Sequence, residues 1–441
     1  MDQTNELTKI DTIDIEKILK EKELRQIVFE DLTHNARAKA TLRNFELLLT
    51  HYGIKIRYNE MSKEYEIDIP HRIFHTDIQA NAKMAVLRSY AHYQGFPVTE
   101  IDNYVIEVGE RNSYHPVRDW IDNQTWDGVD RLQSYYDSII LEEPNTMKER
   151  MMYKWALSLV AALYHPNFSC EGVLTLTGEQ GKGKTIWIEN LIPREYRNIW
   201  NKDAVVIDTK NKDSLTKALK YWIAELGEID ATFRKTDIEA LKGFLTEKVD
   251  VIRNPYEKKA NTYQRRTVFY ATVNEEEFLR DTQNRRFWVL SVKGFNHGPF
   301  DDVGQFWAQM KHIYMSIRDK IHSAGDREKF QEWGWFMSPS ERQLMEPLQE
   351  RYKTVDPVEE ILEAYLEPST CSNGEYMNCT QILKECNFGT PNKQSANTAS
   401  KWLKKNGYRK NWKKEYFVKF KLSTDNVVDL EKVKSKNFGR L

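Results

Sequence analysis

The sequence has 441 residues, of which 40% are hydrophobic, 12% aromatic and 30% charged, and its formal net charge is -1. This length exceeds one ordinary domain, the composition excludes a disordered chain, and the neutral balance means that any nucleic-acid-binding surface must be local. No apolar run approaches the roughly 20 residues of a membrane span, and the N-terminus is too polar for a secretory signal. These features predict a cytoplasmic protein with no membrane partner.

Residue patterns divide the chain into four parts. Residues 1–145 combine helical periodicity with a hairpin signal at GIKIRYNEMSKEYEIDI, which predicts a mainly helical, mixed α/β region acting as an oligomerisation collar or accessory domain. Residues 146–296 alternate strand and helix signals, as an α/β domain requires. A helical extension is expected over 297–356. Pro357 then opens a C-terminal unit, 357–441, with three short helices and a β-ribbon.

A strand-like run, GVLTLT, leads directly into the loop GEQGKGKT at residues 178–185, and an amphipathic IWIENLI follows. In such an arrangement the glycines let backbone N–H groups turn toward a phosphate group. Lys184 is expected to reach the β- and γ-phosphates of ATP, and Thr185 to hold Mg²⁺. The alternative is a glycine-rich turn without a ligand, but a chance match has a probability on the order of one per cent. The predicted nucleotide site consists of Gly178, Gly181, Lys182, Gly183, Lys184 and Thr185.

A phosphate-binding loop of this kind needs an acidic partner at the end of a neighbouring strand. The apolar run YWIAE ends in Glu225, which we assign to the metal, and Glu228 follows as the candidate for activating the attacking water. The usual pair of adjacent acids is missing, because Leu226 comes directly after Glu225. For both acids, the alternative interpretation is a solvated acidic strand end.

A later strand, TVFYATVN, ends in Asn274, whose amide is suited to hydrogen-bond the attacking water or a phosphate. Two adjacent arginines, Arg285 and Arg286, then precede the strand FWVLSV. Such a pair either forms a salt-bridged framework or directs one arginine across a subunit boundary as an arginine finger. The sequence leaves both interpretations open.

With these blocks in order, the chain resembles the virulence-associated protein E family, which looks like a branch of the superfamily 3 helicases within the AAA+ ATPases. The resemblance covers roughly residues 95–292 and rests on YHPVRDWIDNQTWDGVDRL, GEQGKGKT, WIAELGEID, DVIRNPY and ATVNEEEFLRDTQNRRFWVL. It implies an AAA+ P-loop core in a ring, usually a hexamer, that encircles DNA and hydrolyses ATP between subunits. Such proteins serve replication of a phage or another mobile element in a bacterial host cell.

The resemblance also implies roles for single residues. The GEQGKGKT loop corresponds to the Walker A motif, Glu225 with Glu228 to the Walker B region, and Asn274 to the first sensor. Arg285 or Arg286 is then the arginine finger. The opening region lacks primase motifs, so we expect no primase activity, and a primase or host replication proteins would be separate partners.

Superfamily 3 motors insert a hairpin into the ring channel just before the first sensor strand. The corresponding stretch, PYEKKANTYQRR, sets Lys258, Lys259 and Arg265 among tyrosines. Cations beside aromatic residues suit phosphate contacts and base stacking on single-stranded DNA. The alternative is an exposed charged turn.

The C-terminal unit is locally basic. Residues 391–421 contain ten lysines and arginines against one acid, Glu415. Three helices followed by a ribbon suggest a winged-helix-like domain, with SANTASKWLKKNG as recognition helix and NWKKEYF as wing. Lys401, Lys404 and Lys405 are then expected to contact double-stranded DNA, so that the unit recognises a replication origin or fastens the ring to the duplex. A solvated basic face is the alternative.

Three functions are consistent with these patterns. The first is a DNA-translocating replicative helicase. The second is a DNA-binding ATPase that acts as an origin-binding initiator or loader without unwinding, and the third is a non-enzymatic origin-binding protein whose nucleotide only stabilises its assembly. All three predict ATP binding, so only turnover and strand displacement separate them.

Overall fold

The computed structural model describes residues 26–74, 79–205, 216–227, 241, 243–252, 261–274, 285–296, 301–324, 333–350, 352 and 356–421. The chain forms two compact units, Met1–Tyr352 and Lys353–Leu441. Among the described residues, the first unit holds two hydrophobic cores and the second holds one. Among the described helices, none combines the length and the apolar character that crossing a membrane requires.

The first part of the larger unit is a small sheet covered by helices. Strands β1 and β2 pair antiparallel from Lys55↔Asp68 to Asn59↔Glu64, which confirms the predicted hairpin. Helix α2 begins after Thr41, whose side chain accepts a hydrogen bond from Asn44 N, and ends at Gly53, whose φ of 68° suits a residue without a Cβ. The elements are α2 (Leu42–Tyr52), β1 (Lys55–Asn59), β2 (Glu64–Asp68), α3 (Gln79–Tyr93), α4 (Ile101–Arg111) and β3 (Ser113–Tyr114).

The turn of this hairpin is anchored to the rest of the unit by polar contacts. Glu60 forms ion pairs with Arg118 at 3.1 Å and with Arg266 at 3.3 Å. Lys63 is buried and donates a hydrogen bond from Nζ to the backbone oxygen of Leu219 over 2.6 Å. Burial lowers the pKa of Lys63 to about 8. The hairpin therefore joins the small sheet to the central domain.

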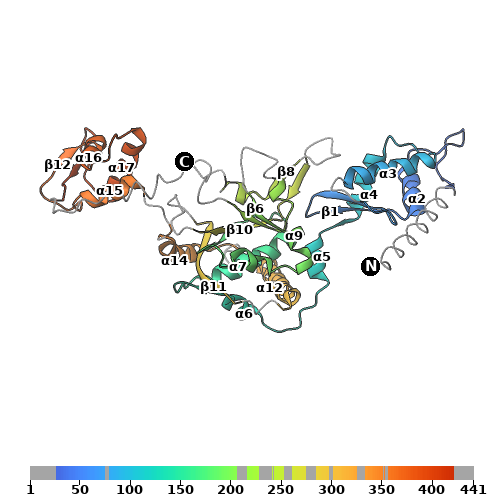
Figure 1. Ribbon diagram of the computed structural model, residues 1–441, viewed down its shortest axis with the longest axis horizontal. Coiled ribbons are helices and arrows are strands. Elements are labelled where there is room, and N and C mark those ends of the chain that lie inside the picture. Colours follow the sequence, from blue (N-terminus) through green and yellow to red (C-terminus); the bar gives the residue numbers. More distant parts are fainter. Residues whose placement is uncertain are drawn as a thin grey trace, which may run out of the picture. The chain divides into compact units, whose positions relative to one another are not determined.

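The central domain is built on a six-stranded sheet with the order β4-β11-β5-β10-β7-β6. Figure 1 labels β11, β10 and β6 of this sheet. Every neighbouring pair is parallel except β11 with β4. Near-continuous apolar runs such as VLTLT suit strands that are buried on both faces. The expected α/β core with a mainly parallel sheet is confirmed. Its strands are β4 (Ile139–Leu141), β5 (Val173–Thr177), β6 (Asn201–Val205), β7 (Ile223–Leu226), β10 (Val268–Val273) and β11 (Phe287–Phe295).

Buried tryptophans join the helices to this sheet. Trp155 of α7 donates its indole N–H to Phe269 O of β10, and Trp222 donates to Leu159 O of α7. Each ring thus buries a large apolar surface and keeps its polar atom bonded. Helix α7 also packs against α12 (Figure 1). The helices are α5 (Pro116–Asp122), α6 (Leu132–Asp137), α7 (Lys148–Tyr164), α8 (Lys184–Glu189), α9 (Arg197–Trp200), α12 (Val303–Ala324) and α14 (Pro339–Glu350), with a 3-10 turn η1 (Arg194–Tyr196).

A separate antiparallel pair, β8 (Val249–Ile252) and β9 (Asn261–Gln264), precedes β10 in the chain. The segment that would connect these two strands lies outside the described residues. Strand β9 is followed by Arg265 and Arg266, and β10 begins two residues later. The pair is therefore directly continuous with the strand that lies at the centre of the sheet.

The smaller unit has the order helix, strand, helix, helix, strand. Two of its helices begin with the same kind of N-cap. Asn378 forms a capping box at the start of α16, and Asn392 forms one at the start of α17. Strand β12 pairs antiparallel with β13, and both pack with the helices around a core that includes Leu362, Leu383 and Leu403. The elements are α15 (Pro357–Tyr365), β12 (Glu375–Met377), α16 (Cys379–Glu385), α17 (Lys393–Lys405) and β13 (Tyr416–Val418).

Candidate nucleotide site

The glycine-rich loop leaves the carboxyl end of β5 in a conformation that needs its glycines. Gly178, Gly181 and Gly183 have φ values of 140°, 83° and 92°, a region that residues with a Cβ rarely occupy. A Cβ on Gly178 would lie 2.6 Å from the backbone oxygen of Val292 in β11. Helix α8 begins immediately after Gly183. The conformation of the loop is thus constrained at its first residue by the close backbone of β11 and at its end by the start of α8.

The ammonium group of Lys184 lies across this loop. Its Nζ donates to Gly178 O over 2.5 Å, to Glu179 O over 3.0 Å and to Asn274 Oδ1 over 3.1 Å. Only 7% of Lys184 is exposed, and burial lowers the pKa of its ammonium. Thr185 is half-buried beside it, while Lys182 pairs with Glu179 at 3.1 Å. A cation is therefore held at the mouth of the loop by neutral oxygens.

Glu225 occupies the third position of β7 and is 6% exposed. One carboxylate oxygen accepts a hydrogen bond from the hydroxyl of Thr272 in β10, and the other accepts from Ala204 N over 3.1 Å. Burial raises the pKa of Glu225, while the positive charge of Lys184 opposes this shift. The carboxylate is thus fixed in direction by two strands and lies within the electrostatic reach of the loop lysine.

A second carboxylate near Glu225 comes from β6 and was missed by the sequence reasoning. Asp203 is exposed, lies on the strand beside β7, and its negative charge contributes to the raised pKa of Glu225. Its Oδ1 lies 3.4 Å from the hydroxyl of Tyr270 in β10. Asp203 precedes Glu225 by more than twenty residues, so only the strand order brings the two acids together. The signal available in the sequence was an acid within a short strand-like run, NKDAVV.

Asn274 follows β10, which lies between β5 and β7 in the sheet. The registers Val273↔Thr177 and Ala271↔Leu226 bring the carboxyl ends of the three strands to one edge. The structure therefore gathers Lys184, Glu225 and Asn274 in one place. Glu228, the predicted water-activating acid, lies outside the described residues.

Residues 121–354, more than half of the chain, match the virulence-associated protein E-like domain. The chain belongs to this family. The expected resemblance to the virulence-associated protein E family is confirmed, and the match contains the whole central sheet described above.

Comparison with solved structures gives low sequence identities. A structure described as the A form apo structure of the NrS-1 C terminal region is 13% identical, with a TM-score of 0.40, and the alignment covers 86% of this chain and 98% of that one. A structure described as SCCmec type IV Cch, active helicase, is 8% identical, with a TM-score of 0.32 and coverages of 67% and 70%. No curated protein sequence matches the chain.

In this virulence-associated protein E-like domain, the two candidate finger arginines lie at the opposite edge of the sheet from the loop. Val173 N donates to Arg286 O over 2.7 Å at the amino end of β5, whereas the loop follows its carboxyl end. Strand β5, which separates Arg286 from the loop, is roughly 17 Å long. Arg285 is exposed, and burial of the half-buried Arg286 lowers its pKa. Neither arginine therefore belongs to the nucleotide site of its own chain.

The prediction that Arg265 contacts DNA was wrong. Its guanidinium is bonded at 2.8 and 2.5 Å to both carboxylate oxygens of Asp250, and it also donates to Phe244 O over 3.1 Å. The same group lies 4.4 Å from the centre of the Phe244 ring, and only 1% of the residue is exposed. Arg265 thus holds the base of the β8–β9 pair and has no access to a phosphate. Lys258 and Lys259 lie outside the described residues.

The predicted DNA-binding lysines of α17 are on the surface of the smaller unit. Lys401, Lys404 and Lys405 are exposed, while Ala399 and Leu403 of the same helix are buried in its core. Their spacing gives one basic helix face opposite the apolar one. This arrangement leaves the cations free to meet an external anion.

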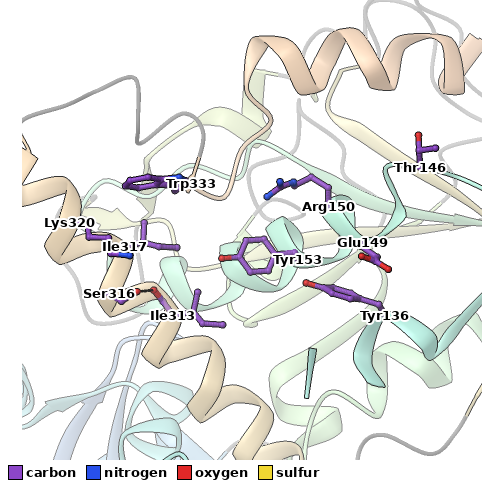
Figure 2. A pocket seen from close by; sticks show the side chains of 10 residues that line it. All are labelled: Tyr136, Thr146, Glu149, Arg150, Tyr153, Ile313, Ser316, Ile317, Lys320 and Trp333. Carbon is purple, nitrogen blue, oxygen red and sulfur yellow. Dashed lines mark hydrogen bonds between the residues drawn. The ribbon is translucent and has the colours of Figure 1, made fainter. Parts of the chain in front are cut away.

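A cavity of about 590 Å³ opens between α7 and α12 (Figure 2). No residue of the phosphate loop lines it, and one of its two cations, Arg150, is paired with Glu341 at 3.1 Å. This cavity lacks the glycine loop and the buried carboxylate that a nucleotide with magnesium requires. Its lining residues are Tyr136, Thr146, Glu149, Arg150, Tyr153, Ile313, Ser316, Ile317, Lys320 and Trp333.

Proposed function

We propose that this protein is an ATP-dependent replicative DNA helicase of a phage or another mobile genetic element. Membership of the virulence-associated protein E family supports this general setting. In the proposal, the central domain is an AAA+ P-loop core, subunits form a hexameric ring, and hydrolysis of ATP between subunits drives translocation on DNA.

The observation that carries the proposal is the meeting of Lys184, Glu225 and Asn274 at one sheet edge, beside a loop of left-handed glycines. A lysine and backbone amides suit the phosphates of ATP, and carboxylates suit Mg²⁺. The hydroxyl oxygen of Thr177, buried one residue before the loop, has no hydrogen-bond partner among the described residues. These groups fit a nucleotide with its metal.

Each residue then has a distinct task. Lys184 exchanges its bonds to the loop carbonyls for phosphate oxygens, and Thr185 with Glu225 would hold Mg²⁺, which neutralises charge that develops on the phosphates. Asn274 orients the attacking water through its side-chain amide. Glu228 is the proposed acceptor of the water's proton, and the negative charges of Glu225 and Asp203 favour its removal.

The arginines and the smaller unit complete the proposal. An arginine on the edge away from its own loop is suited to act on the nucleotide of a neighbouring subunit, which supports Arg285 or Arg286 as the finger. The order of α15, β12, α16, α17 and β13 supports a winged-helix-like DNA-binding domain, with Lys401 and its neighbours on the recognition helix. Replication-origin DNA and a separate primase or host replication proteins are the proposed partners.

The competing function is an origin-binding initiator or loader that hydrolyses ATP without unwinding DNA. A strand-displacement assay on a forked duplex, run beside a phosphate-release assay, separates the two. We expect ATP-dependent unwinding by the wild type and none by Lys184→Ala. ATP hydrolysis without displacement would replace the helicase by the loader, and DNA-bound oligomers without turnover would support a non-enzymatic origin-binding protein.

A matched control distinguishes a specific defect from a loss of folding. Lys217 is an exposed lysine of the same central domain and lies outside the loop. Lys217→Ala is expected to unwind DNA at the wild-type rate. If Lys184→Ala also bound ATP and Mg²⁺ normally, the proposed nucleotide site would be wrong.

A further inference from the structure

One large aromatic side chain of the smaller unit contributes almost nothing to its fold. Trp412 is 87% exposed, whereas Tyr408 and Tyr416, which flank it in the chain, are 7% and 1% exposed. Burial of an aromatic ring is among the largest sources of stability available to a small domain. The position of Trp412 is therefore not explained by packing within the described residues.

The turn that presents Trp412 is closed by hydrogen bonds on both sides. Asn411 N donates to Glu415 O over 2.9 Å, Glu415 N donates to Asn411 Oδ1 over 3.0 Å, and Asn411 Nδ2 donates to Glu415 Oε2 over 2.8 Å. Lys414 N also donates to Asn411 O over 3.2 Å. A ring on such a turn loses little conformational freedom when it binds a partner.

The surroundings of Trp412 are strongly positive. The ammonium group of Lys413 lies 5.2 Å from the centre of the Trp412 ring, and Arg409, Lys410 and Lys414 are also exposed. Glu415, the one acid among residues 391–421, is engaged in the turn by Asn411. Within the described part of the chain, none of these four cations forms an ion pair. The partner that fits is an anion with flat apolar faces.

The turn is also tied to the basic helix. The hydroxyl of Tyr416 lies 2.9 Å from Ser400 Oγ and donates to Ser400 O over 3.1 Å. Ser400 immediately precedes Lys401 on α17, so these contacts join the end of the Trp412 turn to the lysine-bearing helix. A ligand that contacts the Trp412 turn can therefore also reach the lysines of α17.

We propose that Trp412 stacks on an unpaired base of a DNA strand while Lys413 and Lys414 contact the adjoining phosphates. This rests on the proposed function, because it assumes that the smaller unit binds DNA. An unpaired base is required because bases within a duplex already stack on their neighbours, whereas a single strand exposes both faces of each base. Trp412 would thus hold one strand at the place where the duplex opens.

The test measures binding of the full-length protein to labelled single-stranded oligonucleotides by fluorescence anisotropy. Each oligonucleotide is compared with an abasic version of the same length, which keeps the phosphates and lacks the bases. Trp412→Ala is expected to weaken binding to the intact strand by roughly five- to tenfold and to leave abasic binding unchanged. Trp412→Phe should restore most of the loss, because phenylalanine also has a flat aromatic face.

Charge and stacking are separated by salt dependence. Trp412→Ala should leave the slope of log affinity against log salt unchanged, because tryptophan carries no charge. The double variant Lys413→Gln/Lys414→Gln should lower that slope by roughly 1.4, about 0.7 for each phosphate contact on a single strand. Tyr93→Ala, which removes a 66% exposed aromatic residue from α3 of the larger unit, is the control and should bind normally.

Two failures can be told apart. Equal losses on intact and abasic strands, or no loss on either, would overturn the stacking inference while the lysine variant still reports DNA binding. Unchanged affinity and slope in the lysine variant would instead remove this turn as a DNA contact and overturn the inference together with that part of the proposed function. Thermal unfolding of Trp412→Ala should match the wild type, because the ring is 87% exposed.

Discussion

The ammonium group of Lys184 donates a hydrogen bond to the side-chain oxygen of Asn274 over 3.1 Å, although 90 positions separate the two residues. This contact exists because β10 lies directly beside β5 in the sheet. A phosphate that enters the loop would compete for the same ammonium, so binding and the position of Asn274 are coupled.

Asn274→Ala should reduce ATP hydrolysis by roughly 10- to 100-fold, because an oriented polar contact to the reacting groups is lost. Affinity for ATP should change by less than about threefold, since Lys184 and the loop, which are proposed to bind the phosphates, are unchanged in this variant. Steady-state turnover and equilibrium binding of a fluorescent ATP analogue measure the two effects separately. Equal losses in binding and turnover would show that Asn274 supports the loop rather than the reaction.

Glu225→Gln should abolish most turnover while leaving the fold more stable than the wild type. Burial raises the pKa of Glu225, so the folded protein retains its proton at a higher pH than the unfolded chain does. The wild type therefore loses stability as pH rises through that interval, and the amide variant does not. Chemical denaturation of both proteins between pH 4 and about 8 should give curves that converge at low pH and separate at high pH.

The same raised pKa predicts how activity responds to acid. Turnover that needs ionised Glu225 should begin to fall at a higher pH than the ordinary range of an exposed glutamate. The pH profile of kcat/KM, measured at ATP concentrations below KM, tests this expectation, because kcat/KM reports the free protein in which this pKa is raised. An acidic limb at or below the ordinary glutamate range would mean that a different group limits the rate.

Arg265→Met should destabilise the central domain by roughly 3–5 kcal/mol, because it leaves the carboxylate of Asp250 buried and unpaired. The double variant Arg265→Met/Asp250→Leu should be closer to wild type than the sum of the single changes, since both charges are removed together. Denaturant unfolding of the four proteins forms the cycle. Full additivity would contradict a direct ion pair, and a normal fold with weakened DNA binding would return Arg265 to the DNA-contacting residues.

Arg285→Ala and Arg286→Ala, tested singly, should leave ATP binding largely intact, and one of them should remove hydrolysis. Because both arginines lie away from the loop of their own chain, the defect should be repaired by a neighbour. Mixing the inactive arginine variant with Lys184→Ala should therefore restore part of the turnover, as each supplies what the other lacks. If neither arginine variant recovers in such mixtures, an arginine acting between subunits loses its support.

Local features of the sequence were sufficient to identify several parts of this protein. The loop GEQGKGKT is contiguous in sequence, and its glycines indicate a backbone with positive φ angles. The strand, the loop and the start of the helix at residues 173–189 could therefore be predicted without knowledge of the rest of the chain. The parallel α/β core could also be predicted from the sequence, because apolar strand-like runs alternate with helical patterns. Family membership followed from several motifs in a fixed order.

Contacts between distant segments could be decided only by the tertiary structure. Among the residues that the structure describes, Asp203 is an acid close to Glu225 although 22 positions separate the two, because strand order determines which side chains share an edge. Arg265 is one of two adjacent arginines in a basic stretch, yet its guanidinium is buried against Asp250, and no local pattern distinguishes a paired cation from a free one. Composition reports how many charges exist; burial and pairing, which arise from the whole fold, decide which of them can still bind a ligand.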